Sequence, residues 1–343
     1  MAKDQESLEQ SRRIREYLIS KWGKIPTSIW SVDWSVKYTD LSLRYSEQQK
    51  AMADKLGDIV KKSAAFTLSS TGNSGIKCLG MSKFPQDILQ FLVKFLTPEK
   101  LDAPGYFGNY LPTVVDPFAG HNSRAEGCWR CGRNYVGWDI SQAFNRLNQE
   151  ILTTLEKENE ASLIRHEAII DFVVGDSRDI NYSEQFDFSI TSPPFYDSEW
   201  YGDEPEQLGR QKTYNDFIYL LGKIFENVYK ALKQNTYCVV ETNDFRRNGE
   251  FYTYHVDMIN ILKRVGFEMH DLIVCDYGSG FYEAFLSDIE ANKIVSKNHS
   301  YFAIAKKLYK KIETRQETRE RLLTEVQSNN SQTKPSIQQP KMI

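Results

Sequence analysis

The strongest constraint on the fold is a series of short apolar runs that each end on a carboxylate. The first run ends on Asp116 and leads into a turn at Gly120, which an expected helix at 124–132 follows. The next two runs end on Asp139 and Asp176. This order of strand, glycine turn, helix, strand and acid is typical of an α/β half that binds a nucleoside, in which the acid accepts hydrogen bonds from the ribose hydroxyls. The pattern predicts a parallel sheet with a nucleoside site at the ends of its strands.

Apolar runs continue to alternate with amphipathic stretches along the rest of the chain. The expected strands lie at 113–116, 135–139, 172–176, 188–191, 237–242, 268–276 and 300–305. The expected helices lie at 5–22, 46–62, 87–96, 124–132, 214–232 and 254–265. Strands separated by helices predict an α/β fold with a doubly wound, mostly parallel seven-stranded sheet. In such sheets the ligand crevice lies at the carboxyl ends of the strands.

The fourth expected strand ends in a second chemically informative turn, Ser192-Pro193-Pro194-Phe195. The prolines fix the backbone so that the Ser192 hydroxyl and nearby carbonyl oxygens accept hydrogen bonds from a ring amine, while Phe195 offers a stacking face. An amine held this way has its lone pair localised for attack on an electrophile. The alternative interpretation is a plain turn, because Pro-Pro commonly ends a strand.

Three motifs in this order resemble the amino-methylating DNA methyltransferases, which transfer a methyl group from S-adenosylmethionine to cytosine N4 or adenine N6. The motifs are Lys83-Phe84-Pro85 before a helix, Asp116-Pro117-Phe118-Ala119-Gly120, and Thr191-Ser192-Pro193-Pro194-Phe195. The acidic segment 202–209 is similar to members found in phages and mobile elements. The resemblance covers roughly residues 80–307 and implies a class I, Rossmann-like methyltransferase domain.

The resemblance also implies which residues bind the cofactor. They are Lys83, Phe84, Pro85, Asp116, Pro117, Phe118, Ala119, Gly120, Asn122, Asp139, Ile140, Asp176 and Ser177. One departure stands out, because the family loop continues with Ser-Gly-Thr where this chain has His121-Asn122-Ser123. Asn122 tolerates left-handed backbone geometry better than most residues, so the loop keeps its shape in this interpretation, with weakened cofactor affinity. A catalytically dead, DNA-binding scaffold remains an alternative.

The resemblance implies methyl transfer to a flipped base in double-stranded DNA. Its catalytic residues would be Ser192, Pro193, Pro194 and Phe195. Members with serine at this position usually methylate cytosine, so N4-methylcytosine is the expected product and N6-methyladenine the alternative. An RNA or small-metabolite methyltransferase would share the cofactor half and stays open as a different class of enzyme.

The overall charge does not indicate a nucleic-acid-binding protein. There are 43 basic and 46 acidic residues, which give a net charge of −3. Contact with DNA phosphates must then come from a local basic face. The candidates for it are Arg246, Arg247, Lys293, Lys297 and His299. A homodimer and a restriction endonuclease are further partners that the sequence leaves open.

The chain divides into three expected parts. Residues 1–82 form an N-terminal helical and irregular arm, 83–308 the catalytic domain, and 309–343 a charged helical extension with a disordered tail. Within the catalytic domain, 277–298 is a candidate insertion for DNA recognition.

Composition also predicts where the protein works. The start of the chain is charged rather than signal-like, and no apolar run approaches a membrane span of about 20 residues, so we expect a cytoplasmic protein. Five cysteines do not suggest a disulfide framework in a chain of 343 residues. Cys128 and Cys131 form one C-x-x-C pair without a matching second pair, so we expect buried cysteines and no metal site.

Overall fold

A computed structural model describes the greater part of the chain. The described residues are 5–33, 84–98, 110–120, 123–162, 167–197, 204–247, 249–278, 291–293, 295 and 297–308. Several predictions lie outside them: the helix at 46–62, the side chains of Lys83 and Asn122, most of the insertion 277–298, and the tail 309–343.

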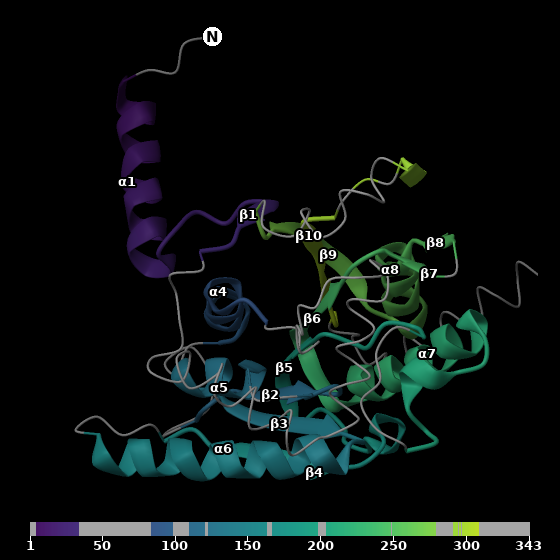
Figure 1. Cartoon of the computed structure of the whole chain (residues 1–343). Coiled ribbons are helices and arrows are strands. Elements are labelled where there is room, and N and C mark those ends of the chain that lie inside the picture. Colours follow the sequence, from purple (N-terminus) through teal and green to yellow (C-terminus); the bar gives the residue numbers. More distant parts are fainter. Residues whose placement is uncertain are drawn as a thin grey trace, which may run out of the picture. The chain divides into compact units, whose positions relative to one another are not determined.

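A sheet of eight strands runs through the described residues in the order β1-β9-β10-β6-β5-β2-β3-β4 (Figure 1). The strands are β1 (Ile29–Ser31), β2 (Thr113–Asp116), β3 (Asn134–Asp139), β4 (Ile170–Val174), β5 (Phe186–Thr191), β6 (Leu232–Thr242), β9 (Glu268–Asp276) and β10 (His299–Lys306). Strand β10 pairs antiparallel with β6 and β9, and every other pair in this sheet is parallel. The predicted fold class, a doubly wound and mostly parallel α/β sheet, is confirmed.

The predicted number of strands is too low by one, because β1 comes from the expected N-terminal arm. Strand β1 pairs in parallel with β9, and its middle residue, Trp30, is only 3% exposed. The Trp30 ring lies 4.7 Å from that of Phe91, and its indole N–H donates to Asp87 at 2.8 Å. A three-residue strand with one inward side chain is too short to show the alternation by which strands are recognised in sequence.

Helices cover both faces of the sheet. They are α4 (Gln86–Leu96), α5 (Ser123–Arg130), α6 (Gln142–Ala161), α7 (Tyr214–Ala231) and α8 (Tyr254–Val265). Helix α1 (Gln5–Trp22) instead packs against α4, through an edge-on contact of Trp22 with Phe95. Two apolar clusters form, one with α4 and α5 and the other with α7 and α8. Val114 belongs to the first cluster and its neighbour Val115 to the second, because successive side chains of a strand point to opposite faces. Both faces of β2 are therefore buried, as a doubly wound sheet requires.

The helix boundaries follow local chemistry. Helix α7 begins after Thr213, whose hydroxyl accepts from the backbone N–H of Asp216. Helix α8 ends at Gly266, where φ is +112°, in the left-handed region that glycine adopts readily. None of the helices in the described part of the chain is long and apolar enough to cross a membrane.

A second, two-stranded sheet follows β6 and was not predicted. It is an antiparallel hairpin of β7 (Phe245–Arg247) and β8 (Glu250–Tyr252). Gly249, with φ at +82°, lies in its turn. Each strand is only three residues long, so the sequence carries no periodic signal for the hairpin.

Candidate active site at the carboxyl ends of the strands

A cavity lies at the carboxyl ends of β2, β3, β4 and β5, where the sequence places its candidate residues. It encloses about 1010 Å³ of empty space, its open mouth included. Its lining comprises Pro117, Phe118, Gly120, Arg124, Asp139, Ile140, Phe144, Asp176, Ser177, Arg178, Ser192, Pro193, Pro194, Phe195, Glu206, Gln207, Leu208, Leu220 and Ile224. Residues of the predicted cofactor loop (Asp116 to Gly120) and of the predicted catalytic turn (Ser192 to Phe195) thus share one cavity.

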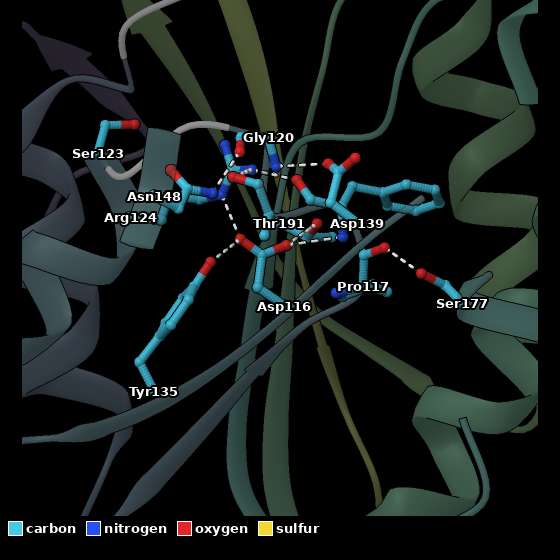
Figure 2. Close-up of polar contacts among 12 residues, drawn as sticks. Asp116, Pro117, Gly120, Ser123, Arg124, Tyr135, Asp139, Asn148, Ser177 and Thr191 are labelled. Carbon is cyan, nitrogen blue, oxygen red and sulfur yellow. Dashed lines mark hydrogen bonds and ion pairs between the residues drawn. The ribbon is translucent and has the colours of Figure 1, made fainter. Parts of the chain in front are cut away.

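Beneath the cavity, the buried carboxylate of Asp116 receives hydrogen bonds from four groups (Figure 2). One oxygen accepts from the Thr191 hydroxyl at 2.6 Å and the Phe118 backbone N–H at 3.0 Å. The other accepts from Arg124 Nε at 2.5 Å and the Tyr135 hydroxyl at 2.7 Å. Burial and the neighbouring Asp116 raise the pKa of Tyr135, which keeps this phenol protonated as a donor. Asp116 does not line the cavity, so its carboxylate organises the loop from below.

Arg124, in the first turn of α5, supports this loop in a way that the sequence did not indicate. It is only 6% exposed, and besides Asp116 its guanidinium donates to the carbonyl oxygens of Phe118 and Ala119. Burial by itself would lower the pKa of Arg124, but Asp116 and other nearby acidic groups raise it above its ordinary value. Arg124 follows directly on the segment that departs from the family pattern. A charged side chain therefore braces the loop here from within.

Both backbone polar groups of Gly120, the N–H and the carbonyl, form hydrogen bonds with side chains. Its N–H donates to Asp139 Oδ2 at 2.7 Å, and its carbonyl accepts from the Asn148 amide at 2.8 Å (Figure 2). The residue has φ at +52°, which favours glycine. The other oxygen of Asp139 accepts from the Ser141 backbone N–H at 2.8 Å.

Asp139 is an acidic side chain of the cavity whose pKa is shifted by its surroundings. Burial raises its pKa to about 6, although the two backbone N–H groups of Ser141 and Gly120 lower it in part. Each carboxylate oxygen accepts one protein hydrogen bond and has a further lone pair. This carboxylate can accept from a ligand hydroxyl.

The third predicted acid, Asp176, also lines the cavity but pairs with a neighbouring side chain. Its carboxylate accepts from the backbone N–H and Nε of Arg178, each at 2.8 Å. The Ser177 hydroxyl donates to the carbonyl of Pro117, which links the end of β4 to the cofactor loop. Asp176 and Ser177 are thus brought to the predicted place.

All four residues of the predicted catalytic turn line the cavity. The Pro194 carbonyl accepts from the Tyr254 hydroxyl at 3.3 Å. The Phe195 ring is half-buried and lies edge-on to Phe245 at 5.7 Å and Tyr254 at 5.9 Å. The turn is therefore supported by α8 and by the β7–β8 hairpin.

Glu241, near the end of β6, is another group that sequence reasoning missed. It is 6% exposed, and its Oε1 accepts from the Tyr277 hydroxyl at 2.6 Å and the Ser300 hydroxyl at 3.0 Å. Burial raises the pKa of Glu241, while the hydroxyls of Tyr277, Ser300 and Ser192 lower it in part. An acid near the carboxyl end of a buried strand was the available signal.

Phe84 and Pro85, from the motif that precedes α4, lie on the side of Arg124 that faces α4, where Phe84 contacts the guanidinium. Phe84 is 1% exposed, and the Arg124 guanidinium lies 5.5 Å from the centre of its ring. Pro85 precedes the first turn of α4. Neither residue lines the cavity that is described, and neither does Ala119, so their cofactor contacts stay predictions.

The structure gathers three of the five predicted DNA-binding residues around the hairpin. Arg246 and Arg247 lie on β7, and the Lys297 ammonium lies 4.4 Å from the centre of the Phe251 ring on β8. His299 begins β10, with its ring edge-on to Tyr301. Lys293 lies in the short described segment 291–293 and stays a prediction.

The cysteine pair is buried, as predicted. Cys128 lies in α5 and Cys131 directly follows it, and burial raises the pKa of both thiols. Within the described ranges, no group of three or more His, Cys, Asp or Glu side chains is arranged to hold a metal ion.

No protein-family model matches the chain, and no curated protein matches it. Among solved structures, a candidate DNA modification methylase from Thermus thermophilus, complexed with S-adenosyl-L-methionine, is 23% identical with a TM-score of 0.31. The match covers 43% of this chain and 59% of the Thermus protein, less than two thirds of its length.

Two other solved structures are matched over nearly their full length. A SAM-dependent methyltransferase from Methanosarcina mazei is 14% identical, with 58% of this chain and 94% of that one covered and a TM-score of 0.38. A structure from Bacillus halodurans C-125, described as that of a candidate methyltransferase, is 14% identical over the same shares, with a TM-score of 0.39. At such identities and TM-scores these similarities do not establish a family.

Replacing Arg124 tests whether the buried ion pair supports the loop. Arg124→Met removes one partner and leaves the Asp116 carboxylate buried, so we expect the free energy of unfolding to fall by about 3–5 kcal/mol. Arg12→Met is the control, because Arg12 pairs with Glu16 at 2.9 Å on an exposed helix face and should cost about 0.5 kcal/mol or less. Denaturant unfolding measures both, and equal losses would contradict the role given to Arg124.

Proposed function

We propose that this protein is a methyltransferase that uses S-adenosylmethionine and methylates the exocyclic amine of a base in double-stranded DNA. One observation carries the proposal: the Gly120 turn with Asp139 and the Ser192 to Phe195 turn line the same cavity. The first arrangement suits a nucleoside, and the second suits a flat ring that carries an amine. Methyl transfer requires that both ligands meet.

The cavity lining fits the cofactor in chemical character. Asp139 would accept hydrogen bonds from the ribose hydroxyls, and Ile140 and Phe118 offer apolar surface for the adenine. Asp176 lies at the next strand end and would face the adenine amine. The cofactor supplies an electrophilic methyl group when it is bound. The residues of the chain orient it and keep water from the reacting centre.

The catalytic turn would act on the second ligand. The Ser192 hydroxyl and the Pro193 carbonyl would accept the two amine hydrogens, which localises the nitrogen lone pair for attack on the methyl group. The new N–C bond would form as the S–C bond breaks and leaves a thioether, and the nitrogen would release one proton to water. The Ser192 hydroxyl lies close enough to Glu241 to lower the pKa of that carboxyl in part. Glu241 would accept a hydrogen bond from this hydroxyl and so fix its orientation. Phe195 would stack on the flipped base and offset part of the cost of unstacking, which is a few kcal/mol.

Cytosine N4 is the proposed target, and adenine N6 is the alternative. Both bases present a similar amine, and serine at position 192 accepts a hydrogen from either. The preference for cytosine rests on the family resemblance of the Ser192 motif. The segment 277–298 is proposed to take part in DNA recognition, and the backbone bond from Tyr277 N–H to the Asn298 carbonyl at 2.7 Å draws its two ends together.

Removing the Asp139 carboxylate should weaken cofactor binding. The Asp139→Ala variant loses charge-assisted hydrogen bonds, so we expect the binding free energy for S-adenosylmethionine to become less favourable by about 1.5–3 kcal/mol. Asp171→Ala, at an exposed carboxylate on β4, is the control. Calorimetric titration measures both variants, and wild-type affinity in Asp139→Ala would contradict the assignment.

The same titration has an expected pH dependence. The pKa of Asp139 is raised to about 6, and the ionised form is the better acceptor for ribose hydroxyls. The affinity for S-adenosylmethionine should therefore be constant above neutral pH and fall as the pH drops through the Asp139 pKa of about 6. The Asp139→Ala variant should lack this fall.

The product identifies the enzyme class. Duplex DNA and RNA are incubated separately with the purified protein and labelled S-adenosylmethionine, and the digested nucleosides are examined by mass spectrometry. We expect N4-methyldeoxycytidine from DNA, and Ser192→Ala should lower the rate by about 100-fold or more because it removes an oriented acceptor. N6-methyldeoxyadenosine alone would overturn the choice of cytosine. Label in RNA only, or in neither polymer, would overturn the proposed function.

A further inference from the structure

The β7–β8 hairpin has two chemically different faces. Its register places Phe245 opposite Tyr252 and Arg246 opposite Phe251. Because successive residues of a strand point to opposite faces, Phe245 and Tyr252 share one face while Arg246 and Phe251 share the other. We call these the inner and the outer face.

The inner face is attached to the catalytic turn. The Phe245 ring lies 5.7 Å from that of Phe195, and the Tyr252 ring lies 6.1 Å from that of Tyr196. Arg247, which is also on this face, donates from Nε to Asp197 Oδ2 at 2.8 Å. Three contacts with three consecutive residues fix the hairpin against the segment that would hold the target base.

The outer face concentrates positive charge around one exposed ring. The Arg246 guanidinium lies 4.9 Å from the centre of the Phe251 ring, and the Lys297 ammonium lies 4.4 Å from it. Phe251 is 43% exposed, and Arg246 is exposed as well. The Arg246 contact, at an exposed site, contributes about 0.5–1 kcal/mol, and the contact of the buried Lys297 ammonium adds to it. The ring thereby helps to hold two like charges near each other.

Among the described residues, none forms an ion pair or a hydrogen bond with the Lys297 ammonium. Its Nζ is also buried. Burial lowers the pKa of Lys297 to about 8. The nearby Asp244 raises this pKa and Arg246 lowers it, and both effects are smaller than that of burial. The Asp244 carboxylate already lies 2.6 Å from the His255 ring nitrogen. An ammonium withdrawn from water without such a partner costs free energy, and a bound anion would offset that cost.

We propose that the outer face, formed by Arg246, Phe251 and Lys297, binds a backbone phosphate of the target DNA beside the flipped base. This inference rests on the proposed function and adds the element that connects DNA contact to the base pocket. A phosphate diester matches a forked guanidinium and a point ammonium on one side. Because the inner face contacts Phe195, phosphate binding would position the hairpin and the stacking ring together.

The test measures how DNA affinity depends on salt for Lys297→Met and Arg246→Gln. The control is Lys306→Met, because Lys306 also lies over an aromatic ring, Tyr237 at 5.0 Å, at the other end of β10. Fluorescence anisotropy gives the affinity for a mixed-sequence duplex over a range of salt concentrations. The slope of log affinity against log salt should become shallower by about 0.9 in each hairpin variant, as for one lost phosphate contact, and stay unchanged in the control.

Two further measurements separate function from folding and DNA from free phosphate. Lys297→Met removes a buried unpaired charge, so its thermal midpoint without DNA should equal or exceed that of the wild type, with cofactor affinity unchanged. Inorganic phosphate at matched ionic strength should not displace the duplex. Displacement would identify a free-phosphate site and overturn the assignment to DNA.

The outcomes distinguish the two proposals. If the wild type methylates DNA while both hairpin variants keep the wild-type slope, the hairpin proposal is overturned and the enzyme assignment stands. If the wild type neither binds nor methylates duplex DNA, the proposed function is overturned and the hairpin proposal with it.

Discussion

The arrangement of the cavity depends on the hydrogen bonds that the buried carboxylate of Asp116 accepts. A charge without contact with water must be satisfied by hydrogen bonds or an ion pair, since leaving it unpaired is costly. Its donors come from the loop after β2, from α5, from β3 and from β5. One side chain thereby connects the end of β2 to the loop that follows it, to α5, and to the more distant strands β3 and β5.

This network also relates the cofactor loop to the catalytic turn. Thr191, which donates to Asp116, directly precedes Ser192, and Phe118, which donates through its backbone, directly precedes the Ala119-Gly120 turn. A displacement of either segment would strain the same carboxylate. The proposed methyl transfer would require the two ligands to be held at a fixed separation, and a shared buried anchor can supply such a constraint.

The sequence was sufficient for the parts whose signal is local and repeated. The runs that end on Asp116 and Asp139 are long enough to show apolar continuity, and their parallel pairing brings those ends to one edge. Strand β1 and the β7–β8 hairpin were missed because three residues carry no periodicity. Their existence depends on tertiary partners, such as Asp87 for Trp30 and Phe195 for Phe245.

The roles of Arg124 and Glu241 could not be read from the sequence for a different reason. A charged residue in a helix or at a strand end is usually exposed, and only the surrounding structure shows that these two are buried. The same applies to Lys297, whose ammonium is buried and lies over the Phe251 ring, far from it in sequence.

In the proposed enzyme, the cofactor and the target base meet in the cavity between the Gly120 turn and Ser192. A structure determined with S-adenosylhomocysteine bound tests it most directly. We expect the ribose hydroxyls within hydrogen-bond distance of Asp139, with the sulfur directed toward Ser192 and Phe195. A ligand bound elsewhere, or one whose sulfur faces away from the catalytic turn, would contradict it.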